Sequence, residues 1–98
     1  MTTPDKSDGQ VFSRLAPILN TRGLHARAAA KFVKTASAYD ARIVVSRGGQ
    51  DVSGNSIMGL MMLAASPGCE IEISCSGDQA EAALSALTGL VAAKFDED

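Results

Sequence analysis

The chain has 98 residues and a formal net charge of −2 at pH 7, and 46% of its residues are hydrophobic. This length accommodates one domain with one modest core. The near-neutral charge excludes a broad basic surface that binds nucleic acid or anionic lipid, so charge recognition must be local. No apolar run approaches the roughly 18 residues of a membrane helix, and no secretory signal opens the chain. We therefore expect a cytoplasmic protein with no membrane or nucleic-acid partner.

The first predicted elements are a tail, a strand and a turn. Residues 1–10 are polar and contain a proline and a glycine, which predicts a disordered N-terminal tail. Residues 11–19 predict a strand, and Pro17 favours an edge position because proline lacks the N–H that a central strand donates. The sequence Asn-Thr-Arg-Gly at 20–23 predicts a turn.

From His25 the pattern changes to that of an α-helix ending near Tyr39 and Asp40. Apolar residues recur with helical spacing on one face: Ala29, Phe32, Val33 and Ala36. Basic residues recur with helical spacing on another: Arg27, Lys31 and Lys34. The sequence thus predicts an amphipathic helix with one basic side.

A hairpin and a short helix follow. The Gly48–Gly49 pair supplies the positive φ angles of a tight turn between a second strand around Ile43 and a third strand at 50–54. Ser56 is a favoured N-cap residue, and we expect it to begin a short helix at 57–65.

The last elements are a strand and a helix. Residues 69–75 alternate between apolar and polar side chains, which predicts a half-buried strand. Asp78 and Glu81 have the spacing of a capping box at the start of the final helix. The apolar face of that helix is Ala80, Ala83, Leu84, Leu87, Leu90 and Val91.

The element order is therefore βαββαβα. Four short strands with helices predict an α+β fold with one sheet that helices cover on one face. We place this domain at residues 11–95 and expect residues 96–98 to form an acidic C-terminal tail.

The two cysteines, Cys69 and Cys75, bracket the fourth strand. Six residues of strand span roughly 20 Å, whereas a disulfide requires Cα atoms about 4.4–6.8 Å apart. The two thiols therefore cannot pair within this strand. We expect both to be reduced, as in the cytoplasm.

The inventory of chemical groups excludes most enzyme sites. There is one histidine, and the two cysteines lie too far apart in the strand to chelate zinc together. The chain has neither a phosphate-binding loop ending in Lys-Ser or Lys-Thr nor a Gly-x-Ser-x-Gly nucleophile elbow. We expect no metal, no cofactor and no independent enzyme activity.

The remaining candidate is the segment Gly23-Leu24-His25-Ala26-Arg27. His25 stands at the predicted start of a helix, where backbone N–H groups lack intrahelical acceptors and the helix dipole favours an anion. Neutral histidine has a nucleophilic nitrogen near neutral pH, and Arg27 can bind phosphate oxygens through two parallel bonds. His25 therefore suits a labile phosphoryl group, although these two residues alone are equally compatible with a histidine that merely caps the helix.

At these residues the chain resembles HPr, the histidine-containing phosphocarrier family of the bacterial phosphoenolpyruvate-dependent phosphotransferase system. The similarity covers about residues 11–94 and rests on Gly-Leu-His-Ala-Arg, on Ser56 before an apolar short helix, and on the βαββαβα order. The Asn55-Ser56-Ile57 stretch, the methionine-rich helix and the Phe-Asp-Glu-Asp ending resemble NPr, the homologue of the nitrogen-related branch.

The resemblance implies an open-faced β-sandwich with a four-stranded antiparallel sheet and three helices on one face. It implies that His25 takes a phosphoryl group from enzyme I, of the sugar or nitrogen type, and passes it to an enzyme IIA-type protein. Arg27 would stabilise the phosphate. Ser56 would match a regulatory site that an HPr kinase/phosphorylase phosphorylates in some members. A carrier that meets its partners in turn through one surface is expected to be a monomer.

One residue departs from the family pattern. The family usually has proline after the arginine, whereas this chain has Ala28. Proline fixes φ in the first helical turn, whereas alanine keeps its N–H and its helix propensity. We expect the helix to form and the turn around His25 to be less rigid, which affects transfer rate more than transfer itself.

The short helix after Ser56 is too apolar to bury every side chain. We expect Ile57, Met58 and Met61 to be exposed as a docking patch for partner proteins. Lys31 and Lys34 lead away from His25 and would steer an acidic partner, unless they form an ordinary solvated face. The alternative function is a regulatory binding module that Ser56 phosphorylation controls and that transfers no phosphate.

Overall fold

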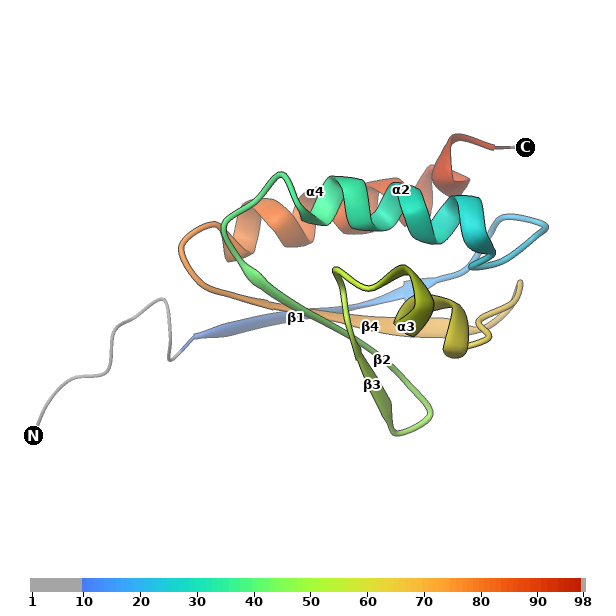
Figure 1. The fold of residues 1–98 in the computed structure, drawn as a ribbon, viewed down its shortest axis with the longest axis horizontal. Helices are drawn as coiled ribbons and strands as arrows, with labels where there is room; N and C mark the ends of the chain where they lie inside the picture. Colours follow the sequence, from blue (N-terminus) through green and yellow to red (C-terminus); the bar gives the residue numbers. More distant parts are fainter. Residues whose placement is uncertain (1–9, 98) are drawn as a thin grey trace, which may run out of the picture.

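The computed structural model describes residues 10–97, so the predicted tail at 1–10 lies outside the described residues except for Gln10. Seven regular elements and one 3₁₀ turn follow one another along the chain (Figure 1). In order they are β1 (Val11–Pro17), α2 (Ala26–Ala36), β2 (Arg42–Arg47), β3 (Gln50–Ser53), α3 (Ile57–Met62), β4 (Glu70–Ser76), α4 (Ala80–Ala92) and η1 (Lys94–Asp96). The predicted βαββαβα order is confirmed.

The four strands form one antiparallel sheet in the order β1-β4-β2-β3. Strand β1 lies at an edge, as Pro17 predicts. The β2–β3 hairpin turns at Gly48 and Gly49, whose φ angles of 58° and 82° are positive as expected.

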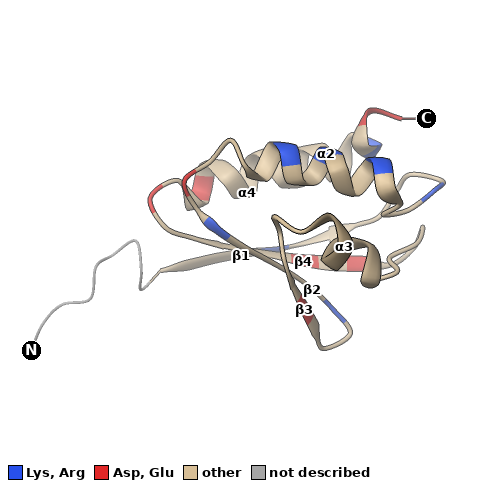
Figure 2. Cartoon of the chain, in the orientation of Figure 1, with Lys and Arg blue, Asp and Glu red and all other residues tan. Residues whose placement is uncertain are grey.

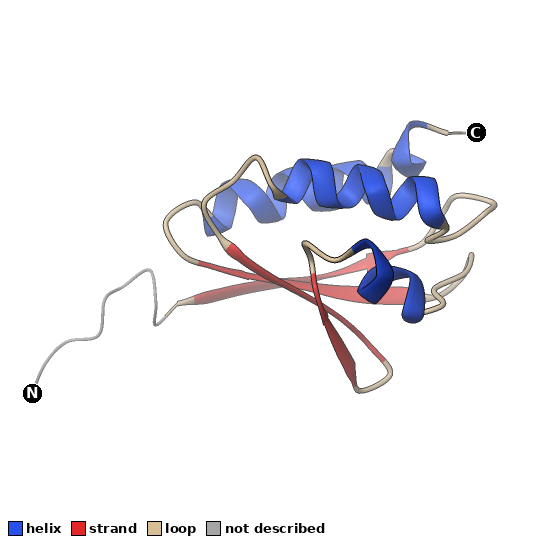
Figure 3. Cartoon of the chain, in the orientation of Figure 1, coloured by secondary structure: helices blue, strands red, loops and turns tan. Residues whose placement is uncertain are grey.

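The helices lie on one face of this sheet, and α2 and α4 pack beside each other (Figures 1 and 3). Alternate strand residues point toward them, so that Val45 of β2 and Ile73 of β4 are opposite each other and fully buried. The helices contribute Phe32 of α2 and Leu87 of α4 to the same core, and both side chains are also fully buried. This arrangement is the α+β open-faced sandwich expected from the sequence.

Two helices end earlier than predicted. Helix α2 ends at Ala36 because the next N–H groups bond to carbonyls three residues back, Ala38 to Thr35 and Tyr39 to Ala36. Helix α3 ends at Met62, and Ala64 already has a left-handed φ of 53°. Intrinsic helix propensity does not reveal such tight final turns.

The predicted capping box at α4 is wrong. Gln79 is the N-cap residue, and its side chain makes no capping bond. Its Oε1 instead accepts the backbone N–H of Asp40 at 2.6 Å, and its own N–H donates to the Asp40 carbonyl at 2.9 Å. This tie to the α2–β2 loop places Gln79, rather than Asp78, at the start of the helix.

Both cysteines are unpaired, as predicted. Hydrogen bonds from Ser66 are the main cause that lowers the pKa of the Cys69 thiol, and the Arg47 guanidinium 3.1 Å away acts in the same direction. Burial raises the pKa of the Cys75 thiol in the sheet.

Within residues 10–97, no cluster of three or more His, Cys, Asp or Glu side chains is arranged to hold a metal ion, and every helix is too short or too polar to cross a membrane.

Candidate functional site

His25 is the N-cap residue of α2. Its backbone is extended, with φ −77° and ψ 179°, and its carbonyl accepts the first helical bond from the N–H of Ala29 at 2.8 Å. The N–H groups of Ala26, Arg27 and Ala28 precede that bond and have no intrahelical acceptor. The predicted position of His25 at a helix start is therefore confirmed, and an anion there meets the positive end of the helix dipole.

The turn before His25 is fixed from inside the protein. Asn20 is fully buried, and its Nδ2 donates to the carbonyl of Gly23 at 2.8 Å. The Gly23 N–H donates back to the Asn20 carbonyl at 3.2 Å, and the next N–H, of Leu24, donates to the Ala65 carbonyl at 2.9 Å. The sequence indicated a turn here but gave no sign that Asn20 would be buried.

Gly23 is the residue in this turn that tolerates the least change. Its φ is +66°, and a Cβ built on it would lie 2.5 Å from the carbonyl oxygen of Ala65. We expect Gly23→Ala to lower the free energy of unfolding by about 2–4 kcal/mol, because left-handed backbone strain adds to a backbone clash. Denaturant unfolding monitored by circular dichroism measures this loss.

The matched control is Gly48→Ala. Gly48 has a similar φ of +58°, but a Cβ there would meet nothing within 4 Å. The control therefore isolates backbone strain from the clash. Equal losses of unfolding free energy in the two variants would show that the close approach of Ala65 to Gly23 does not contribute to the cost of Gly23→Ala.

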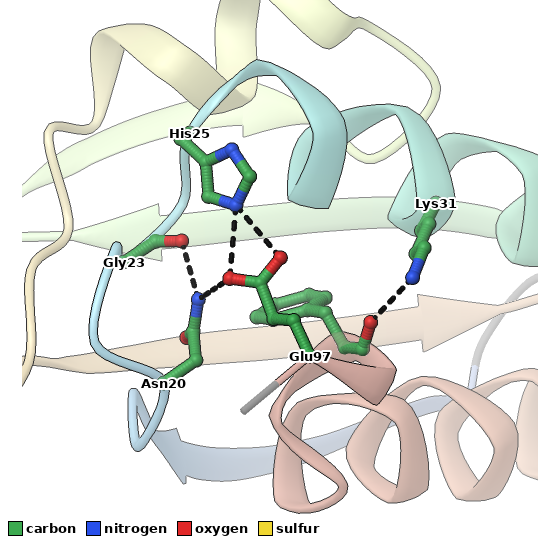
Figure 4. Close-up of polar contacts among 6 residues, drawn as sticks. Asn20, Gly23, His25, Lys31 and Glu97 are labelled. Carbon is green, nitrogen blue, oxygen red and sulfur yellow. Dashed lines mark hydrogen bonds and ion pairs between the residues drawn. The ribbon is translucent and has the colours of Figure 1, made fainter.

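A carboxylate from the end of the chain binds the histidine. Glu97 Oε1 and Oε2 each lie 2.9 Å from His25 Nε2, and Oε1 also accepts Asn20 Nδ2 at 2.8 Å (Figure 4). Both side chains are largely covered, with 22% of His25 and 17% of Glu97 exposed. The sequence analysis assigned Glu97 to an acidic tail, whereas the structure places it in the site.

A left-handed turn carries Glu97 to this place. Lys94, Phe95 and Asp96 have φ angles of 58°, 55° and 60°, an arrangement that costs free energy for residues other than glycine. Phe95 is fully buried, and its carbonyl accepts Lys31 Nζ at 2.7 Å. The segment lies at the end of the molecule where α2 begins (Figure 1).

This bond changes the interpretation of Lys31. The sequence placed Lys31 on an open basic face, but its ammonium group is bound to the Phe95 carbonyl. Lys34 is exposed, and no hydrogen bond or ion pair involves it in residues 10–97. Figure 2 marks in blue the positions of the Lys and Arg residues along the α2 ribbon.

The pKa of Glu97 lies below the usual range of a glutamate. The hydrogen bond from Asn20 is the largest cause, followed by the hydrogen bond with His25. Burial opposes them by raising the pKa, and the electrostatic effects of His25 and Arg22 lower it by smaller amounts. A carboxyl with a lowered folded-state pKa stabilises the fold above its unfolded-state pKa, and that stabilisation is lost as pH falls through the folded-state pKa.

We therefore expect the Glu97–His25 contact to persist through mildly acid pH and to open only below the ordinary glutamate range. A ¹³C NMR titration of the Glu97 side-chain carboxyl measures this directly. Glu81, an exposed glutamate in α4, serves as the internal reference. A Glu97 midpoint equal to or above that of Glu81 would contradict the expectation.

Arg27 is exposed on the first turn of α2, and no hydrogen bond or ion pair of its side chain is found in the described part of the chain. It lies two residues from His25, and its guanidinium is accessible to a ligand there. Ala28, where the family usually has proline, is fully buried and lies within the helix. The helix thus forms without proline, as expected.

Ser56 caps α3, as the sequence predicts. Its Oγ accepts the N–H of Gly59 at 2.9 Å. The three side chains expected at the docking patch are all exposed, Ile57 by 40%, Met58 by 70% and Met61 by 39%. Met62 is also exposed, by 66%. The N–H of Leu24 donates to the carbonyl of Ala65, so the segment that follows α3 lies beside the loop before His25.

Similarity to known proteins identifies the family of this chain. The sequence matches the PTS-HPr family, described as "PTS HPr component phosphorylation site", over residues 12–93. It is 47% identical over 81 residues to phosphocarrier protein HPr of Pseudomonas aeruginosa, covering 82% of this chain and 90% of that one. It is 45% identical over 84 residues to phosphocarrier protein NPr of Shewanella violacea, covering 86% and 92%.

Solved structures show the same likeness. The crystal structure of HPr-C-His from Thermoanaerobacter tengcongensis superposes with a TM-score of 0.85 at 41% identity, covering 89% of this chain and 98% of that one. HPr from Bacillus anthracis superposes with a TM-score of 0.77 at 38% identity, covering 81% and 94%.

Fold and sequence together define a phosphocarrier of the phosphotransferase system. The chain belongs to the HPr family, and relatives of both the HPr and the NPr type match it closely.

Proposed function

We propose that His25 accepts a phosphoryl group from phosphorylated enzyme I in the cytoplasm and passes it to an enzyme IIA-type protein. The observation that carries this proposal is the position of His25 at the N-terminus of α2, with one ring nitrogen bound to Glu97 and the other facing away from it (Figure 4). A histidine that merely caps a helix has no need of a carboxylate partner.

The geometry distinguishes the two ring nitrogens. A carboxylate only accepts hydrogen bonds, so Nε2 beside Glu97 carries the proton and Nδ1 of the neutral ring keeps the lone pair. That lone pair forms the bond to phosphorus, and the bond between phosphorus and the donor breaks with its electron pair left on the donor. The N–H groups of the first turn of α2 and the Arg27 guanidinium would then stabilise the phosphoryl oxygens.

The docking surface of this proposal is the apolar patch of α3. Ile57, Met58 and Met61 are exposed on α3, the segment after α3 bonds the loop before His25, and methionine side chains adapt to different partners. Lys34 adds an exposed positive charge that would speed the encounter with an acidic partner. A monomer would present this surface to the donor and the acceptor in turn.

Phosphorylation from phosphoenolpyruvate tests the proposal. The chain is incubated with phosphoenolpyruvate and enzyme I of the sugar type or of the nitrogen type, and its intact mass is measured. We expect one added phosphate that is labile in acid and stable in base, as a phosphohistidine is. The faster of the two donors identifies the branch.

The alternative is a regulatory binding module controlled at Ser56. Ser56 is partly exposed at the edge of the docking patch, so a phosphate from an HPr kinase/phosphorylase would change the charge of that surface. The same mass assay separates the two functions. A regulatory module would gain phosphate from the kinase in a Ser56-dependent manner and none from either enzyme I.

A further inference from the structure

The contacts of Glu97 reach beyond the acceptor histidine itself. The carboxylate lies at the end of three consecutive left-handed residues, and it meets two side chains from the β1–α2 loop, Asn20 and His25. A residue 72 positions away in sequence is thus brought to the Nε2 edge of the imidazole.

We propose that Glu97 is a positioning residue for phosphoryl transfer, which holds the proton of His25 on Nε2 and keeps the lone pair on Nδ1. This inference rests on the proposed role of His25 as the phosphoryl acceptor. It extends that role to a residue outside the Gly-Leu-His-Ala-Arg segment.

Asn20 fixes the orientation of the carboxylate. Its Nδ2 donates to two oxygens, the Gly23 carbonyl and Glu97 Oε1. Were the amide turned over, its oxygen would face both of these acceptors, so the orientation with Nδ2 toward them is the favourable one. Asn20 Oδ1 is buried without a hydrogen-bond partner within residues 10–97, so both side-chain hydrogen bonds of Asn20 found there are donated by Nδ2.

The carboxylate in turn fixes the ring. Both Glu97 oxygens lie 2.9 Å from Nε2, and neither has a hydrogen to give to that nitrogen. The tautomer with hydrogen on Nδ1 would place the Nε2 lone pair against two anionic oxygens. Carboxylates beside the histidines of hydrolase triads select a tautomer in the same manner.

The charge of Glu97 also acts during transfer. As the Nδ1–phosphorus bond forms, the ring nitrogen gives up electron density and the imidazole gains positive charge. The nearby carboxylate compensates that charge. Glu97 contacts the Nε2 edge of the ring and makes no bond to Nδ1, the nitrogen that would receive the phosphoryl group (Figure 4).

Glu97→Gln removes the charge while keeping the size of the side chain. A glutamine presents one acceptor and one donor to Nε2, so it accommodates either tautomer. The matched control is Asp96→Asn, which removes the same charge one residue earlier. Asp96 is exposed, and asparagine tolerates its left-handed φ of 60°.

The first readout is the ¹⁵N NMR spectrum of the His25 ring in the unphosphorylated proteins at a pH where the ring is neutral. We expect wild type and Asp96→Asn to show a protonated Nε2 and an unprotonated Nδ1. We expect Glu97→Gln to show a mixture of tautomers. This readout needs no phosphoryl donor, so it tests Glu97 even if enzyme I transfers nothing to the chain.

The second readout is the rate of phosphoryl transfer from phosphorylated enzyme I. We expect Glu97→Gln to lower kcat by about 10- to 100-fold, the range found when a group that orients a metal-bound histidine is removed, with little change in KM. An unchanged ring spectrum together with an unchanged kcat would overturn the proposal. A loss confined to KM would assign Glu97 to partner binding and would also overturn it.

Discussion

His25→Ala is expected to abolish the gain of phosphate from phosphoenolpyruvate and enzyme I. His25 is the chain's one histidine, so the variant has no other imidazole to form an acid-labile, base-stable phosphoramidate. The expected result is a mass spectrum without the phosphorylated species at times when the wild type is converted. Intact mass measured before and after acid treatment records this outcome.

A second substitution separates chemistry from folding. His25 is the N-cap residue of α2, although its side chain makes no capping hydrogen bond, and asparagine is among the most favoured residues at that position whereas alanine is disfavoured. We expect His25→Asn to unfold at a denaturant concentration similar to that of the wild type and still to gain no phosphate. Acid-labile phosphate on either variant would place the acceptor elsewhere and refute the proposed role of His25.

Local sequence patterns predicted most of the fold. The alternation of residues 69–75 indicated the strand β4, Pro17 indicated an edge strand, and Gly48 and Gly49 indicated the hairpin turn. Ser56 indicated the cap of α3. Each of these features depends on neighbours in the chain, which is why one sequence was sufficient to identify them.

The parts that sequence reasoning missed depend on distant contacts. Gln79 is the N-cap residue of α4 because its side chain is hydrogen-bonded to the Asp40 N–H, and a capping-box pattern in the sequence cannot indicate that long-range bond. Asn20 is of a residue type common in exposed turns, and its burial becomes evident only in the packed structure. Glu97 lay in a polar ending that resembled a solvated tail. The available signal was Phe95, a single large apolar residue among acidic ones, because burying such a side chain in the core is favourable.

The same reasoning explains why the sequence predicted the histidine and the arginine of the candidate site but not the carboxylate. A histidine before an apolar helical pattern, with an arginine two residues later, is a local signal, and it indicated the proposed acceptor. The carboxylate comes from a turn of three left-handed residues without glycine, a conformation that the backbone preferences of these residues do not predict. Its position follows from the burial of Phe95 and from the bond between Lys31 and the Phe95 carbonyl.

Phe95→Ala is expected to lower the free energy of unfolding by about 3–5 kcal/mol, the usual loss for a fully buried phenylalanine. The side chain is the anchor of the turn at residues 94–96, so its removal also takes away the contact that offsets left-handed strain. Urea unfolding followed by circular dichroism measures the loss. Phe12→Ala serves as the control, because Phe12 is only partly buried against the core and should cost less.

The functional consequence follows from the position of the anchor. Without Phe95 the turn has no buried side chain to hold it, and Glu97 should leave the Nε2 edge of His25. The ¹⁵N ring spectrum of folded Phe95→Ala should therefore match that of Glu97→Gln. A loss of stability below about 1 kcal/mol would show that residues 94–97 open locally without unfolding the core. A wild-type ring spectrum in this variant would show that the bonds from Asn20 and His25 hold Glu97 in place without the buried ring.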